Sequence, residues 1–192
     1  MSADLVRQVA RSWDGSKCLD TLMNAAPVCL ADVPAGPGIY ALYDHSGRPR
    51  YIGITAKCLN DRIFRRHAAG DGNSHKFSTV YNAGRMFHSR KDSATCSVDG
   101  PIAKELRRLF IRSHCAAVAI PFRGYGKTQL LALEAQVCEL APDEMTRWNN
   151  ARVLETEEPT ELLDSFLLSL GWPDGKLAAV ERQANRWKTR CS

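Results

Sequence analysis

Apolar residues along the middle of the chain follow two different spacings, which separate strands from helices. Residues 38–44 and 50–55 are short runs rich in Ile, Leu and Tyr, and a turn sequence, His45-Ser-Gly-Arg-Pro, lies between them. Such a pair of runs is typical of a β-hairpin. A continuous apolar run at 115–122 predicts a third strand.

Elsewhere the apolar residues recur at helical spacing. The run from Leu59 to Arg66 puts apolar groups on one side and arginines on the other, which predicts an amphipathic helix with a basic face. Residues 142–148 are interpreted as a loop, and 73–100 have no clear pattern. The predicted helices are 3–13, 18–26, 59–69, 102–114, 130–140, 159–170 and 176–190.

The resulting order of elements is β-β-α-α-β-α with helical extensions. It predicts the α/β (α+β) class, a small sandwich in which helices flank a short three-stranded mixed sheet. We expect a helical N-terminal extension at 1–35, a central domain at 36–152 and a helical C-terminal extension at 153–192.

Composition excludes several classes of protein. The 192 residues are 44% hydrophobic and 24% charged, as expected of a globular domain and not of a disordered or fibrous chain. The longest apolar run is too short to span a membrane, and the N-terminus has no signal peptide pattern, so we expect a cytoplasmic protein. The seven cysteines are scattered, without metal-ligand spacing, and are interpreted as reduced thiols.

Charge is unevenly distributed along the chain. Residues 48–91 hold ten Lys and Arg against two acids, a local net charge of +8, whereas residues 134–164 hold nine acids against two arginines, a net of −7. A concentrated positive segment attracts polyanions, above all phosphate backbones. A solvated basic surface without a ligand is the simpler alternative.

Four side chains stand out as candidate chemistry. Tyr40 ends the tripeptide Gly38-Ile-Tyr and Tyr51 begins the tripeptide Tyr51-Ile-Gly, eleven residues later on the next predicted strand. Arg62 follows after another eleven residues, on the basic helix, and Glu134 is the acid within the first turns of an apolar helix. If the hairpin closes, the two phenols converge on one face of the sheet.

These four elements resemble the GIY-YIG nuclease family, and the resemblance covers about residues 36–150. It implies that Tyr40 and Tyr51 contact and activate the attacking water or the scissile phosphate. It further implies that Arg62 stabilises the transition state and that Glu134 holds one divalent ion, Mg²⁺ or Mn²⁺, per active site. A hard cation that keeps most of its waters needs only one or two carboxylates, so a single Glu suffices.

A tyrosine base has an ordinary pKa near 10 and needs help to lose its proton, so a partner is expected. The candidates are His67 and His75, and the choice between them stays open. Some family members carry a His four residues after the helical Arg, whereas here Arg66 takes that place and His67 follows one position later.

Further residues are expected to bind the nucleic acid. Asn149 or Asn150 corresponds to the family's asparagine, which supports the site by hydrogen bonds. The predicted nucleic-acid-binding residues are Arg65, Arg66, Lys76, Arg85 and Asn149.

The sequence therefore predicts a metal-dependent endonuclease acting on DNA, most simply double-stranded, with no membrane partner. A restriction-type role would imply a homodimer, while a repair or mobile-element role is equally compatible. Two alternatives remain: a catalytically silent DNA-binding or interaction module on the same fold, and a nuclease directed at RNA.

Overall fold

The computed structural model describes residues 13–70, 75–89, 96–150 and 157–191. Their contacts divide the chain into two compact units. The first contains the described residues within 13–28, 32–60 and 116–150, and the second those within 29–31, 61–115 and 157–191.

The first unit is built on the predicted hairpin, β2 (Gly38–Tyr43) and β3 (Pro49–Thr55). The two strands pair antiparallel, and β4 (Ala116–Pro121) pairs antiparallel with the other side of β2. A two-residue strand, β1 (Val28–Cys29), completes the order β1-β4-β2-β3. The expected three-stranded mixed sheet was therefore wrong in detail, because a fourth short strand is added and the pairings of β2 are antiparallel.

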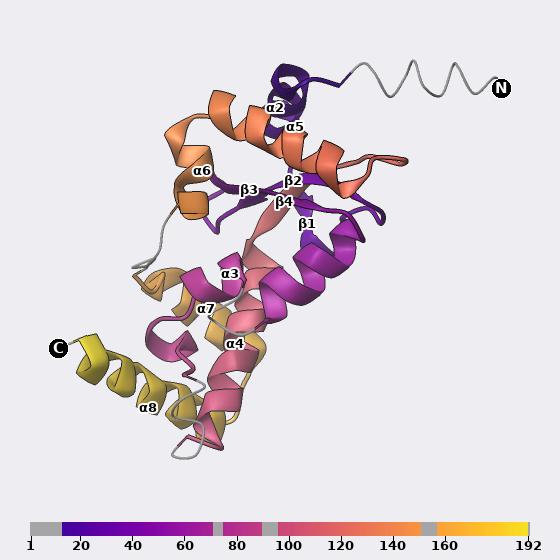
Figure 1. Ribbon diagram of the computed structural model, residues 1–192. Coiled ribbons are helices and arrows are strands. Elements are labelled where there is room, and N and C mark those ends of the chain that lie inside the picture. Colours follow the sequence, from indigo (N-terminus) through magenta and orange to yellow (C-terminus); the bar gives the residue numbers. More distant parts are fainter. Residues whose placement is uncertain (1–12, 71–74, 90–95, 151–156, 192) are drawn as a thin grey trace. The chain divides into compact units, whose positions relative to one another are not determined.

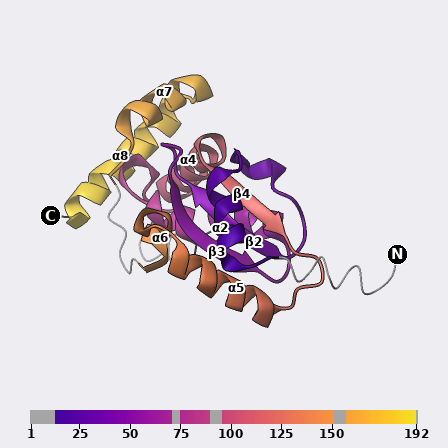
Figure 2. The same ribbon diagram turned by 90° about the horizontal axis from the view of Figure 1, so that it is seen from above.

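Two helices of this unit, α2 (Gly15–Asn24) and α5 (Lys127–Leu140), lie on the same side of the sheet (Figures 1 and 2). Alternation along the strands directs Ile39, Ala41 and Ile52 towards them. These side chains join the apolar stripe of α5, formed by Leu130, Leu133 and Val137, in a continuous core. Burial of this face holds the sheet and its helices together.

A third helix, α6 (Asp143–Asn150), packs against β3. It covers residues 143–148 of the segment 142–148 that was interpreted as a loop, so that prediction was wrong. The helix forms because Met145 and Trp148, three residues apart, are both buried, at 1% and 6% exposure. Polar residues fill the other positions and hide this short apolar face in the sequence.

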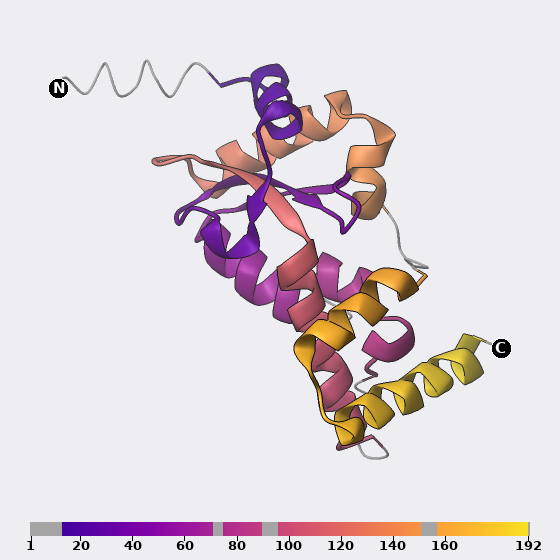
Figure 3. The same cartoon turned by 180° about the vertical axis from the view of Figure 1, so that it is seen from behind.

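The second unit is helical. It contains a π-helix, η2 (Asp61–His67), two short helices, α3 (Lys76–Val80) and η3 (Gly84–Met86), and the long helix α4 (Asp99–His114). The C-terminal helices α7 (Thr160–Leu170) and α8 (Asp174–Cys191) complete it, and η1 (Leu30–Asp32) begins within its short N-terminal segment. In Figure 3, α7 and α8, coloured orange to yellow, lie beside α4.

Most predicted elements are confirmed within one to three residues at their ends. The helix expected at 3–13 lies almost wholly outside the described residues. The unassigned region 73–100 provides α3 and η3. The free thiols include Cys18, Cys29, Cys58, Cys96, Cys115 and Cys138, as expected. A search of the same ranges finds no helix both long and apolar enough to cross a membrane.

Candidate active site

The hairpin brings the two tyrosines together on one face of the sheet. Tyr40 of β2 pairs with Gly53 of β3, and Leu42 pairs with Tyr51, so both rings project from the face opposite Ile39. Their ring centroids are 6.1 Å apart, with planes inclined at 44°. Tyr40 is fully buried and Tyr51 is partly exposed. Of the two side chains, Tyr51 is therefore the one that solvent can reach.

Gly53 leaves the space that these rings occupy. A Cβ atom at this position would lie 2.6 Å from Cε1 of Tyr51 and 2.8 Å from Oη of Tyr40. Contacts this short are not tolerated in folded proteins, so any side chain here would displace at least one phenol. Gly53, the glycine of the second tripeptide, is therefore needed sterically for Tyr40 of the first tripeptide to lie beside Tyr51.

Asn149 of α6 holds the strand that carries Tyr51. Its Oδ1 accepts a hydrogen bond from the backbone N–H of Ile52 at 3.0 Å, and its Nδ2 donates to the carbonyl of Ile52 at 2.7 Å. β3 is an edge strand of the sheet, so the Asn149 amide provides the hydrogen bonds that a neighbouring strand would otherwise make. These contacts occupy both ends of its amide, and the supporting role expected of this asparagine stays a prediction. The side chain of Asn150 lies outside the described residues.

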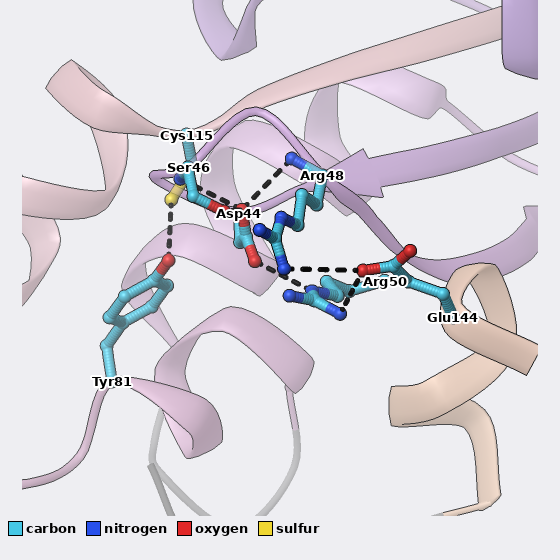
Figure 4. Close-up of polar contacts among 7 residues, drawn as sticks. All are labelled: Asp44, Ser46, Arg48, Arg50, Tyr81, Cys115 and Glu144. Atoms are coloured by element: carbon cyan, nitrogen blue, oxygen red, sulfur yellow. Dashed lines mark hydrogen bonds and ion pairs between the residues drawn. The ribbon is translucent and has the colours of Figure 1, made fainter. Parts of the chain in front are cut away.

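An ionic cluster at the hairpin turn fixes the other end of α6 (Figure 4). Asp44 accepts hydrogen bonds from Ser46 and, at 2.7 Å, from Nε of Arg50, whose Nη1 donates to Glu144 of α6 at 2.9 Å. Burial opposes ionisation of Asp44, but the hydrogen bonds from Ser46, Arg50 and Arg48 outweigh it and lower its pKa. Arg50 precedes Tyr51, so this cluster and Asn149 hold β3 on both sides of the tyrosine.

Sequence reasoning missed this cluster. Asp44 and Ser46-Gly47 carried a usable signal, because an Asp that begins a tight turn commonly accepts hydrogen bonds from the residues after it. The pairing of Arg50 with Glu144 had none, since the two residues are 94 positions apart.

In the second unit, the π-helix η2 carries Arg62 and His67. Hydrogen bonding in a π-helix links residues five apart, so side chains at i and i+5 share a face. The ion pair between Asp61 and Arg66, at 2.9 Å, has this spacing. Arg62 and His67 have it too, and the charge of Arg62 acts on the His67 ring. The wider winding thus places Arg62 and His67 on one face although they are five residues apart.

His67 is buried and lies beside His75, with ring centroids 5.7 Å apart. Its Nδ1 accepts a hydrogen bond from the backbone N–H of Lys76 at 3.2 Å, which leaves the proton on Nε2. Burial, followed by the positive charges of Arg62, His75 and Lys76, lowers the pKa of His67 well below its usual range. A neutral His67 acts as a hydrogen-bond donor through Nε2, whereas His75 is partly exposed. Both histidines stay candidates for the proton relay.

The expected nucleic-acid-binding cations have different surroundings. Arg65 is exposed, and Arg66 is exposed but paired with Asp61. Lys76 is partly buried, which lowers the pKa of its ammonium group. The Arg85 side chain is only 10% exposed, and its guanidinium is bound by Glu158 at 2.7 Å and Asp164 at 2.5 Å. These contacts favour a structural role for Arg85.

Glu134 is partly exposed on the flank of α5, next to the buried Leu133. Burial raises the pKa of the Cys138 thiol, one turn later, and the negative charge of Glu134 raises it further. Within the described ranges no group of three or more His, Cys, Asp or Glu could hold a metal ion. Glu134 itself can offer one carboxylate, a ligand type that a largely hydrated hard cation accepts, whereas structural zinc sites need four ligands.

Figure 4 also shows a separate contact of the second unit, in which the Cys115 thiol donates to Oη of Tyr81 at 3.5 Å. Both groups are buried, so this contact joins α4 to the segment after α3 and has no part in the candidate chemistry.

Comparison of the chain with protein-family models, curated proteins and solved structures finds no match.

Proposed function

We propose that this chain is a metal-dependent endonuclease that hydrolyses phosphodiester bonds in double-stranded DNA. The observation that supports this most is the pair of rings from Tyr40 and Tyr51, whose centroids are 6.1 Å apart. The two rings occupy space that is open only because Gly53 has no side chain. Packing alone does not require two neighbouring tyrosines on adjacent strands, nor the contacts of Arg50 and Asn149 that hold β3 on either side of Tyr51. The proposal also rests on the resemblance of the motifs to the GIY-YIG family.

Hydrolysis of a phosphodiester is extremely slow without a catalyst, so the site must supply charge neutralisation, a positioned water and a proton acceptor. The partly exposed Tyr51 would orient or deprotonate the water, and the buried Tyr40 would help to fix the position of that water. Arg62 would stabilise the negative charge that develops on the phosphate, because its planar guanidinium stays charged and matches two oxygens.

Glu134 would hold one Mg²⁺ or Mn²⁺ ion. When bound, such an ion polarises a phosphate oxygen and lowers the pKa of a water molecule. A single carboxylate leaves most of the coordination sphere to water and substrate, in keeping with the habits of Mg²⁺.

Cleavage of supercoiled plasmid in the presence of Mg²⁺ tests this proposal. The parent protein should nick and linearise the plasmid with Mg²⁺ and do neither in EDTA. Glu134→Gln keeps the shape of the side chain and removes its charge, so cleavage should fall by on the order of 100-fold or more while folding and DNA binding are retained. Arg62→Ala should lower turnover by a similar factor.

The matched control is Glu139→Gln, which makes the same change at an exposed position of the same helix. It should cleave like the parent. A parent that binds plasmid and never cuts it, with either metal, would instead make the chain a silent DNA-binding module.

A further inference from the structure

Three basic residues of α4 occupy one face of the helix. Lys104, Arg108 and Arg112 follow at intervals of four residues, so their side chains form a row along two turns, about 12 Å at 1.5 Å per residue. We call this row the α4 basic stripe. It lies outside the basic segment 48–91 that the charge pattern of the sequence singled out.

Arg112 is fixed in place by a neighbouring element. Its guanidinium carbon lies 3.9 Å from the centre of the Phe64 ring, and its Nη2 donates to the carbonyl oxygen of Phe64 at 3.3 Å. Its Nε is buried and has no hydrogen-bond partner within the described ranges. Phe64 belongs to η2, and the exposed Arg65 follows it in the sequence.

Arg108 and Arg112 lack the carboxylates that neutralise other cations of this unit. Neither Arg108 nor Arg112 forms an ion pair among the residues that the structure describes. The nearest acids of α4 bind elsewhere: Glu105 pairs with Lys176 at 3.2 Å, and Asp99 pairs with Arg182 at 2.8 Å.

Two cations one turn apart without a counterion repel each other. Burial, together with the positive charge of Arg108, lowers the pKa of Arg112. An anion bound at the stripe would remove this repulsion. Arg66 and Arg85 differ, because each is already paired with at least one carboxylate.

We propose that the α4 basic stripe binds the phosphate backbone of the DNA. This inference rests on the proposed nuclease function and assigns α4 as an element that binds the DNA substrate. Planar guanidinium groups suit phosphate oxygens, and a rigid helix keeps the row in register with the strand. Such contacts position the duplex and carry no sequence information.

The test measures the affinity for a short DNA duplex in EDTA, where no hydrolysis takes place, over a range of salt concentrations. Arg108→Gln should weaken binding on the order of tenfold and reduce the slope of log K against log salt by about 0.9, the value for one lost phosphate contact. Arg108→Lys should restore most of the slope. Arg123→Gln, which removes the same charge from an exposed loop of the other unit, is the control and should change neither quantity appreciably.

Thermal unfolding at low salt separates binding from folding. Arg108→Gln removes a repulsion, so its melting temperature should equal or exceed that of the parent. A lowered melting temperature together with weaker binding would assign Arg108 a structural role and overturn the proposal. Unchanged affinity and slope in Arg108→Gln would overturn it as well, while plasmid cleavage by the parent would leave the nuclease function standing. A parent that neither binds nor cuts DNA would refute both.

Discussion

Replacement of Gly53 by Ala perturbs the tyrosine pair without touching either tyrosine. The added Cβ would lie 2.6 Å from Tyr51 and 2.8 Å from Tyr40, both under the 3.0 Å that Cβ atoms essentially always respect. Tyr40 is fully buried and cannot rotate into solvent. The backbone cannot retreat either, because β2 pairs with one side of β3 and Asn149 with the other.

Overpacking of this kind costs about 1–3 kcal/mol of the free energy of unfolding. For a chain of this size, each kcal/mol lowers the melting temperature by about 2–4 °C, so the variant should melt roughly 3–10 °C below the parent. Plasmid cleavage should fall much further than stability, by on the order of 100-fold, because displacement of a catalytic group by about 1 Å has that effect.

Circular dichroism melts and plasmid cleavage below the melting temperature measure the two effects separately. Gly175→Ala is the matched control, since nothing lies within 4 Å of the added Cβ and the position is in the first turn of α8. This control should be as stable as the parent or slightly more stable, because Ala favours a helix. A Gly53→Ala protein with parental stability would refute the packing of the two rings over this glycine.

Three further predictions concern residues around the candidate site. Asn149→Leu removes both hydrogen bonds to Ile52 and should lower the free energy of unfolding by about 1–3 kcal/mol and slow cleavage, as chemical denaturation and plasmid assays would show; parental values would contradict its supporting role. The lowered pKa of His67 means that the unfolded chain binds the proton first as the pH falls, so stability declines below about pH 6.5; His67→Gln should flatten this decline in melts from pH 5 to 8, and an identical profile would contradict it. Arg85→Met leaves the Glu158 carboxylate without its partner and should cost about 3 kcal/mol while DNA affinity stays unchanged; a stable variant with weak binding would make Arg85 a surface contact after all.

The sequence was sufficient for the hairpin and for the convergence of the tyrosines. Both follow from local rules, since strand residues alternate faces and a tight turn sets the register of its strands. The long helices were equally accessible because their apolar stripes span several turns. α6 was not, because only Met145 and Trp148 mark its buried face within eight residues.

Pairings between distant residues were beyond reach for a different reason. Arg85 belongs to the most basic part of the sequence, yet its carboxylate partner Glu158 is 73 residues away. A local count of charges therefore assigns a buried structural arginine to the surface. The π-helical winding of η2, which puts Arg62 and His67 on one face, also has no sequence signature.

Single-turnover hydrolysis of an end-labelled DNA duplex with Mg²⁺, compared among the parent, Tyr40→Phe and Tyr51→Phe, tests the central claim most directly. Each substitution removes one oxygen and keeps the ring that packs, so folding should be preserved within about 1–2 kcal/mol. The parent should cut and accelerate as the pH rises towards 9, whereas at least the Tyr51→Phe protein should lose most of its rate at neutral pH and gain little at high pH. Equal rates for all three proteins across this pH range would contradict the claim that these phenols carry the chemistry.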